Sequence, residues 1–303
     1  MIHPIVSCEQ IVNFIKRKSH RNDFKLDSLK QNTMADSKNP KKLIINADDF
    51  GYTPGVTYGI IESYKNGLVS STTALTVSEH FFPAMQAAQK LCPTLPIGLH
   101  LTLTLNAGKP ILPKNTVPSL VDSEGVFWKL GVFDQKVSQE ISPDEVYAEW
   151  EAQLLKFLES DQKPSHIDSH HYVHTKNEAL LKMALKLAKK YDLPLRGISP
   201  NEENKHLVKQ YTEANVKTTD EMLIQFYEKG ATFDNLKNMI EYICESPNQS
   251  FEINVHTGFL DALLPKVSGY THGRINELDI LTSAKAKELI EGSNVTLTNF
   301  REM

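Results

Sequence analysis

The stretch Leu43-Ile-Ile-Asn-Ala-Asp-Asp-Phe-Gly-Tyr-Thr-Pro-Gly55 decides the fold class of this chain. Its three branched aliphatic residues predict a buried strand, which stops at two adjacent carboxylates, Asp48 and Asp49. A turn and a helix follow, because Thr53 can cap a helix and Pro54 suits its first position. The carboxylates are therefore expected at the C-terminal end of a strand, where α/β proteins place their chemistry.

The Asp48–Asp49 pair has two interpretations. Neighbouring carboxylates repel each other, so one of them needs a cation or a proton, which favours one metal ligand beside one general base. The alternative is a turn in which the aspartates accept hydrogen bonds from nearby backbone N–H groups. This stretch alone does not separate the two.

Composition narrows the class of protein. The chain has 303 residues, of which 40% are hydrophobic and 23% charged, enough for one large α/β domain or two small ones. A formal charge of −4 argues against nucleic acid or an anionic membrane as the main partner. No apolar run approaches the length of a membrane span. The scattered cysteines Cys8, Cys92 and Cys244 form no disulfide or metal pattern, so a cytoplasmic location is expected.

Residues 1–40 differ from the rest of the chain. They are polar and lack the continuous apolar segment of a signal peptide, so we interpret them as a disordered N-terminal extension, with Met34 as a candidate natural start. Strands and helices alternate from residue 43 onward, in about seven or eight repeats. Such a run predicts an α/β fold with a closed or nearly closed parallel barrel, and residues 41–303 are expected to form one catalytic domain.

Local patterns give the expected elements. Further strands are expected at residues 68–77, 95–104, 165–170, 193–198, 251–255 and 295–298. Capping boxes open helices at Ser142–Glu145 and at Thr175–Glu178, and a last helix is expected at residues 282–291. Residues 106–142 predict a functional loop, and residues 200–230 are ambiguous.

His100 lies in a strictly alternating segment, Ile97–Leu103, where it shares one face with Gly98 and Thr102. This face is expected to point into the barrel beside Gly98, where space is available. His100 would then face the cavity at whose mouth Asp48 and Asp49 are expected. The alternative is a hydrogen-bonded core histidine.

Four of the eleven histidines fall between His166 and His174. Purely structural histidines seldom cluster, so a metal site is the better explanation. His170 lies nearest the C-terminal end of the expected strand and is the favoured ligand, while Asp168 could orient a neighbouring histidine. His171 and His174 fall in the following loop, where they could contact substrate.

His256 ends a further strand, either as a cap or as a general acid. One aspartate and two histidines from three strand ends would form a metal site with open positions for water and a substrate oxygen. A further aspartate and a further histidine remain as base and acid. This set fits hydrolysis of an amide or an ester.

The chain resembles the YdjC-like carbohydrate deacetylases, including bacterial chitooligosaccharide deacetylases. The resemblance covers about residues 42–300, and the order and spacing of its motifs are specific. The matching motifs are Asn46-Ala-Asp-Asp-Phe-Gly51, Gly67-Leu-Val-Ser-Ser-Thr-Thr73, Gly98-Leu-His100, His166-Ile-Asp-Ser-His-His171, Val173-His174, Val255-His256, Gly273-Arg274, Glu277-Leu278 and Ile280-Leu-Thr-Ser283.

The resemblance implies a distorted (β/α) barrel of the polysaccharide-deacetylase type. It implies a divalent metal held at Asp49, His100 and His170, with Mg²⁺ as the usual ion and Zn²⁺ or another transition metal as alternatives. It assigns Asp48 as base and His256 as acid, an order that adjacency alone cannot give. Thr257 departs from the pattern, since many relatives have proline there.

The implied substrates are small N-acetylated, β-linked glucosamine oligosaccharides, such as diacetylchitobiose or its 6-phosphate, which lose acetate. Family analogy also suggests a homodimer. Candidates for contact with sugar are Trp128, Tyr172, His171 and His174, with Phe127 and Phe259 as further aromatic candidates; the alternative is that the aromatic residues belong to the core. Rival functions are a metal-dependent phosphoesterase, a non-haem iron oxygenase and a catalytically silent sugar-binding module.

Overall fold

The structure is a computed structural model that describes residues 39–199 and 204–303. The predicted extension at residues 1–40 therefore lies outside the described residues, apart from its last two. Met34 and Cys8 lie outside them as well.

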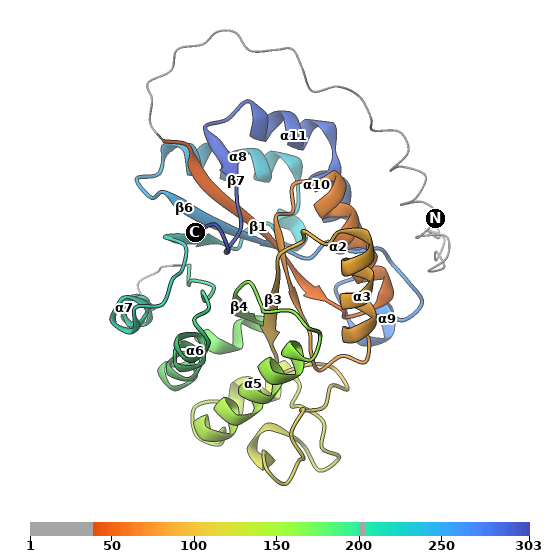
Figure 1. Cartoon of the computed structure of the whole chain (residues 1–303), viewed down its shortest axis with the longest axis vertical. Helices are drawn as coiled ribbons and strands as arrows, with labels where there is room; N and C mark the ends of the chain where they lie inside the picture. Colours follow the sequence, from red (N-terminus) through yellow and green to blue (C-terminus); the bar gives the residue numbers. More distant parts are fainter. Residues whose placement is uncertain (1–38, 200–203) are drawn as a thin grey trace.

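One parallel sheet organises the described residues (Figure 1). Its strand order is β4-β3-β2-β1-β6-β5, and β7 pairs with the first residues of β1. The strands are β1 (Lys41–Phe50), β2 (Ser71–Ala74), β3 (Ile97–Leu101), β4 (Ile167–Ser169), β5 (Glu221–Leu223), β6 (Ser250–Val255) and β7 (Val295–Leu297). The sheet curves into a half-barrel, which confirms the predicted fold class.

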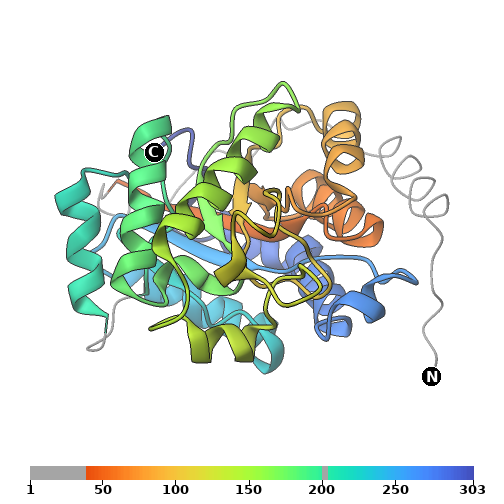
Figure 2. The same ribbon diagram turned by 90° about the horizontal axis from the view of Figure 1, so that it is seen from below.

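Helices surround this sheet, as the two views in Figures 1 and 2 show. None of those in the described residues is long and apolar enough to cross a membrane. The α-helices are α2 (Pro54–Asn66), α3 (Phe81–Leu91), α4 (Leu130–Lys136), α5 (Pro143–Leu158), α6 (Glu178–Tyr191), α7 (Lys205–Ala214), α8 (Phe233–Glu245), α9 (Leu264–Val267), α10 (His272–Thr282) and α11 (Ala284–Glu291). Three short 3₁₀ helices are η1 (Pro118–Leu120), η2 (His170–Thr175) and η3 (Glu228–Gly230).

The two faces of the sheet differ in polarity. In β1, Leu43, Ile45 and Ala47 join the hydrophobic core, whereas the alternating Asn46 and Asp48 make buried polar contacts. Because side chains alternate along a strand, these polar residues share the interior face of the half-barrel. A purely parallel sheet is usually apolar on both faces, so this polar interior marks the place of the site.

A bulge near the end of β1 turns the two aspartates apart. The register with β2 shifts between Ala47 and Phe50, and Asp49 has a φ of +74°. Left-handed backbone at a non-glycine residue is strained, and bulges recur beside active sites. The next turn uses Gly51, whose φ of +83° suits glycine.

The first helix matches the prediction. In α2, Thr53 Oγ1 accepts a hydrogen bond from the Val56 N–H at 3.3 Å, Pro54 takes the first position, and the helix ends at Asn66. The capping box predicted at Thr175 is wrong. Asn177 caps α6 instead, with its side-chain oxygen accepting from the Leu180 N–H at 2.9 Å, because residues up to Thr175 already belong to η2.

Three other segments also differ from the prediction. The strand expected at residues 193–198 is a single bridge between Leu195 and Ile167. The ambiguous region at residues 200–230 contains α7 and β5. The single helix expected at residues 282–291 is α11, and α10 precedes it unpredicted. Its buried residues include Arg274 and Glu277, so its hydrophobic period is broken.

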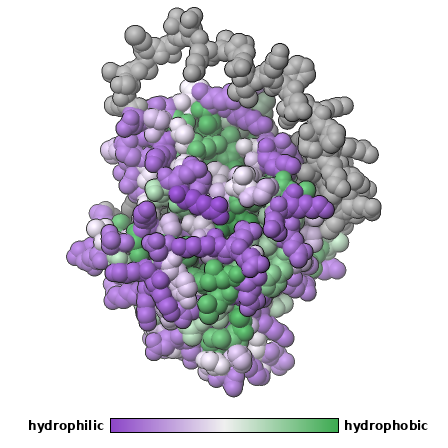
Figure 3. All heavy atoms as spheres, viewed as in Figure 1, coloured by the Kyte–Doolittle hydropathy of each residue, from purple (hydrophilic) through white to green (hydrophobic). Residues whose placement is uncertain are grey.

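Most of the surface facing the viewer in Figure 3 is hydrophilic, with smaller hydrophobic areas between. Among the described residues, Leu155 on α5 is the most exposed large apolar side chain, at 51%. Scattered apolar residues of this kind are ordinary on a protein surface. The homodimer stays a prediction.

Candidate active site

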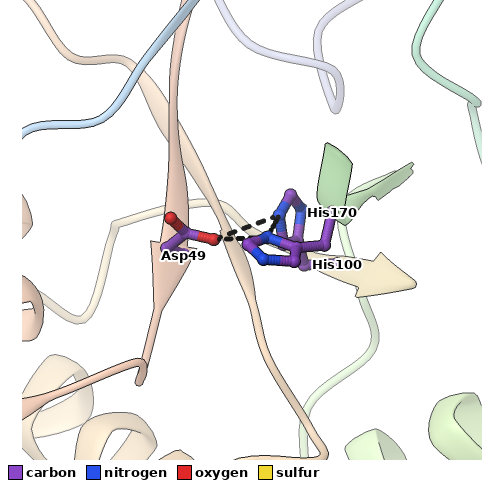
Figure 4. A group of neighbouring side chains, drawn as sticks. All are labelled: Asp49, His100 and His170. Atoms are coloured by element: carbon purple, nitrogen blue, oxygen red, sulfur yellow. Dashed lines mark hydrogen bonds and ion pairs between the residues drawn. The ribbon is translucent and has the colours of Figure 1, made fainter. Parts of the chain in front are cut away.

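Asp49, His100 and His170 converge at the C-terminal ends of the strands (Figure 4). They come from β1, from β3 and from the first residue of η2, directly after β4. Asp49 Oδ1 lies 2.9 Å from His170 Nδ1 and 3.3 Å from His100 Nε2, and the two ring nitrogens are 3.3 Å apart. All three residues are buried. These are the three residues predicted as metal ligands.

Polar contacts around the cluster fix His100 and Asp49 in place. His100 Nδ1 lies 2.6 Å from Asp168 Oδ1. Burial would lower the pKa of His100, but the Asp168 carboxylate raises it to about 10, so a metal bound at Nε2 would displace a proton from the ring. Asp168 thus makes the predicted contact with a neighbouring histidine, and Thr73 Oγ1 donates to its other oxygen at 2.9 Å. Arg274 Nη2 donates to Asp49 Oδ2 at 2.6 Å.

Asp49 Oδ1 is buried and makes no aligned hydrogen bond with the described residues, although two histidine nitrogens lie within ion-pair distance. The pKa of Asp49 is nevertheless held well below its ordinary value. Burial alone would raise it, but the charges of His170 and Arg274 outweigh that effect. An ionised carboxylate oxygen and two imidazole nitrogens directed at one point fit a divalent metal.

A second group of potential ligands, formed by Asp48, His100 and Asp168, lies beside the first. Arg196 completes this group from within the protein. Its Nη1 donates to Asp48 Oδ2 at 2.7 Å and lies 2.8 Å from Asp168 Oδ2, and its Nη2 donates to Asp48 Oδ1 at 2.6 Å. Its Nε donates to Glu252 Oε1 at 2.7 Å. A guanidinium therefore stands where a cation would bind.

The contacts with Arg196 affect the charge of Asp48 and of Glu252 differently. Burial would raise the pKa of Asp48, but the charge and hydrogen bonds of Arg196 hold it well below its ordinary value. Burial of Glu252 outweighs the same guanidinium and raises the pKa of that carboxyl to about 7. Asp48 is therefore ionised throughout the neutral range, whereas Glu252 is poised to exchange a proton.

His256 follows β6 and lines a cavity together with Asp48, Asp49, His100 and His170. Its backbone N–H donates to Glu277 Oε2 at 2.5 Å, and its Nδ1 is buried without a hydrogen-bond partner in the part of the chain that the structure describes. Burial lowers the pKa of His256 to about 4, against the opposing charges of Asp48 and Asp49. The imidazole is therefore neutral at neutral pH, whereas the general acid predicted from the sequence would carry a proton.

A cavity of about 610 Å³ opens above these groups. It includes Asp48, Asp49, His100, His170 and His256 in its lining, and also two of the predicted substrate contacts, His171 and Tyr172. Both have left-handed backbone, with φ of 54° and 53°, which is strained for such residues. His171 Nδ1 lies 2.9 Å from Thr104 Oγ1.

The other predicted substrate contacts lie elsewhere. His174 is fully buried, with its Nδ1 2.5 Å from Ser169 Oγ, because η2 turns it back into the protein. Trp128 is outside the cavity lining and donates through Nε1 to the Ser119 carbonyl at 2.8 Å. Phe127 is in the core, at 2% exposure. His174, Trp128 and Phe127 therefore do not line the cavity, in contrast to His171 and Tyr172.

The space expected beside Gly98 is also filled. A Cβ on Gly98 would lie 2.6 Å from the ring of His166, which stacks on Phe300 with centroids 3.9 Å apart. Burial and the charge of Arg196 lower the pKa of His166 well below its ordinary value. This neutral, buried histidine packs below the site and is not part of the cavity lining.

Sequence reasoning missed several residues of the site. Arg196 is a single charge in the apolar run that begins at Leu193, and Glu252 is a single charge inside the strand Phe251–Val255. A charge at an interior strand position was the available signal, since a buried charge needs a partner. Tyr227 gave no signal, because it lies in the region that the sequence left ambiguous.

Comparisons with known proteins show the family of this chain. The family of YdjC-like proteins matches residues 42–292. A carbohydrate deacetylase of Enterococcus faecalis is 51% identical over 263 residues, covering 87% of this chain and 98% of the relative. One from Clostridium beijerinckii is 36% identical over 263 residues, covering 86% of this chain and 100% of the relative.

A solved structure is also similar to this chain over most of its length. It is a protein of Enterococcus faecalis V583 that carries the provisional name cellobiose-phosphate cleavage protein, with 50% identity and a TM-score of 0.83. The match covers 87% of this chain and 98% of that one. The chain belongs to the YdjC-like family.

Proposed function

We propose that the protein is a metal-dependent carbohydrate deacetylase that removes N-acetyl groups from chitooligosaccharides, such as diacetylchitobiose or its 6-phosphate. The observation that carries this proposal is the convergence of Asp49 Oδ1, His100 Nε2 and His170 Nδ1 beside the ionised Asp48. The relatives named carbohydrate deacetylase support it, at 51% and 36% identity over almost their whole lengths.

Asp49, His100 and His170 would hold the metal. A divalent ion there supplies Lewis-acid polarisation of the acetyl carbonyl and a lowered pKa of water. The family resemblance implies Mg²⁺, whereas two imidazole donors suit a transition metal such as Zn²⁺ better. Metal analysis of the purified protein separates these ions.

Asp48 is the proposed general base. A carboxylate has about four lone-pair positions, and Asn46 and the two Arg196 nitrogens occupy three of those of Asp48. One position remains to accept a proton from the attacking water. Arg196 keeps Asp48 ionised and fixed in orientation, at the cost of some basicity.

His256 is the proposed donor to the departing amine. Because its pKa is lowered to about 4, it holds no proton in the resting site at neutral pH. Asp48 takes a proton from the attacking water, and this proton must pass from Asp48 to His256 before the C–N bond breaks, so that His256 can deliver it to the amine. Acetate and a free glucosamine unit leave the site.

The test is acetate release from N,N′-diacetylchitobiose and its 6-phosphate by the wild-type protein and by Asp48→Asn. We expect release by the wild type, and a loss of about a thousandfold in Asp48→Asn with its metal retained. Asp279→Asn is a matched control, because Asp279 is exposed on α10. Unchanged release by Asp48→Asn would overturn the assignment of the base.

A further inference from the structure

Two tyrosines flank His256 in the cavity, and no motif pointed to either one. The ring centroid of Tyr227 lies 5.3 Å from that of His256 and 4.4 Å from that of Tyr270, and Tyr270 lies 5.9 Å from His256. Both tyrosines line the cavity. The three rings thus form one aromatic corner at the end of β6.

Tyr270 is fixed firmly in this corner. Its hydroxyl donates to Glu277 Oε1 at 2.5 Å and accepts from the Glu228 N–H at 3.2 Å. A Cβ on Gly273 would lie 2.2 Å from Tyr270 Cζ, so only glycine lets the ring lie against the start of α10. The ring therefore has one position, which is the requirement for a preformed binding surface.

Tyr227, by contrast, faces solvent. It is 40% exposed, and the neighbouring Ile224, which also lines the cavity, is 45% exposed. The next residue, Glu228, has a φ of 49°, which is strained for a glutamate. An exposed aromatic ring on a strained segment at the mouth of a cavity is not explained by packing of the core.

The proposed chemistry locates the sugar relative to this corner. The nitrogen that His256 would protonate is bonded directly to the sugar ring, so that ring must lie next to His256 when the C–N bond breaks. Tyr227 and Tyr270 are the aromatic side chains that contact His256. Pyranose rings carry an apolar face of C–H groups, which an aromatic ring can cover.

We propose that Tyr227 and Tyr270 form the subsite for the pyranose ring whose N-acetyl group is removed. The C–H face of the sugar packs on the exposed Tyr227. Tyr270 keeps the rings of Tyr227 and His256 in fixed relative positions. This inference rests on the proposed function, because it uses the role of His256.

The test is binding of the deacetylated disaccharide, glucosaminyl-glucosamine, to the full-length protein carrying its metal, followed by NMR titration. This probe has no acetyl group and is not consumed. We expect Tyr227→Ala to bind it about tenfold more weakly than the wild type and Tyr227→Phe to bind within twofold. Tyr242→Ala is the matched control, because Tyr242 is 47% exposed on α8 and should leave the affinity unchanged.

Gly273→Ala is a second variant that displaces Tyr270 without removing any chemical group, and we expect it to weaken binding as well. Equal affinity of the wild type and Tyr227→Ala, or no binding by the wild type, would overturn the subsite. Binding through Tyr227 without acetate release would leave the subsite standing and remove the proposed function. Acetate release with the same KM in the wild type and in Tyr227→Ala would remove the subsite and leave the proposed function standing.

Discussion

Two adjacent groups of buried charged residues lie inside the half-barrel, and they differ in the source of the positive charge that balances their carboxylates. In the inner group, Arg196 contacts Asp48, Asp168 and Glu252, so the protein supplies its own cation. In the outer group, one carboxylate oxygen of Asp49 and one ring nitrogen each of His100 and His170 lie within 3.3 Å of one another, and each is a potential metal ligand. Asp48 and Asp49 are neighbours in sequence, yet each belongs to a different group.

The difference supports the proposal that the inner group is structural and that the outer group binds a metal. A buried carboxylate is tolerated when it is paired, and a carboxylate oxygen with two imidazole nitrogens directed at one point is suited to a bound cation. The inner group has three carboxyls for one guanidinium, which accords with the raised pKa of Glu252. The contact between His100 and Asp168 links the groups, so a dication at the outer group would also offset the excess negative charge of the inner one.

The largest expected effect comes from removing a ligand of the outer group. His170→Ala should lose its bound metal and reduce acetate release by a factor of roughly ten thousand, since the metal's charge stabilisation goes with it. Elemental analysis and an acetate assay on the same sample measure both. His206→Ala, at an exposed position of α7, should change neither. Loss of activity with full metal content would contradict this account of the outer group.

Breaking the inner group should cost stability. Arg196→Met removes the cation from three buried carboxyls while keeping the length of the side chain, and should lower the free energy of unfolding by about 3 kcal/mol. Denaturant unfolding measures the change. Lys237→Met removes an exposed lysine that pairs with Glu241 on the same helix, and should cost less than about 0.5 kcal/mol. Similar losses in both variants would show that the inner group is not a paired network.

The smallest effect concerns pH. Burial raises the pKa of Glu277 to about 7, despite hydrogen bonds from Tyr270 and the His256 N–H and the charge of Arg274. Between about pH 4.5 and 7 the folded protein keeps a proton that the unfolded chain has lost, so the free energy of unfolding falls as pH rises. Glu277 contributes at most about 1.4 kcal/mol per pH unit to this fall.

Glu277→Gln should therefore make the decline between pH 5 and 7 shallower, as followed by urea unfolding at several pH values. Glu245→Gln, exposed at the end of α8, is the control and should leave the slope unchanged. A slope in Glu277→Gln equal to that of the wild type would contradict the raised pKa.

The sequence predicted the fold and the outer group well for physical reasons. Strand β1 and helix α2 follow from a local apolar run and a local cap. The three outer residues were predicted because histidines are rare and seldom cluster, because the C-terminal ends of parallel strands meet at one edge, and because the family resemblance favoured Asp49 over Asp48. The comparisons confirm the family and fold, while the roles of Asp48, Asp49 and the histidines stay predictions.

The inner group could not be predicted because its partners are far apart in sequence. Arg196 is 148 residues from Asp48, so no local spacing connects them. The same holds beside the outer group, where Arg274 is 225 residues from Asp49. Helix α10 was missed because its buried Arg274 and Glu277 interrupt the hydrophobic period. His174 was misplaced because η2 turns it inward, which a strand-and-loop pattern does not reveal.

The central claim is that the outer group holds the metal on which deacetylation depends. The most direct measurement is acetate release from N,N′-diacetylchitobiose by the wild-type protein as purified, after removal of its metal by a chelator, and after addition of Mg²⁺ or Zn²⁺. We predict that release stops when the metal is removed and returns when one of these ions is added. Equal acetate release before and after complete removal of the metal would contradict the claim.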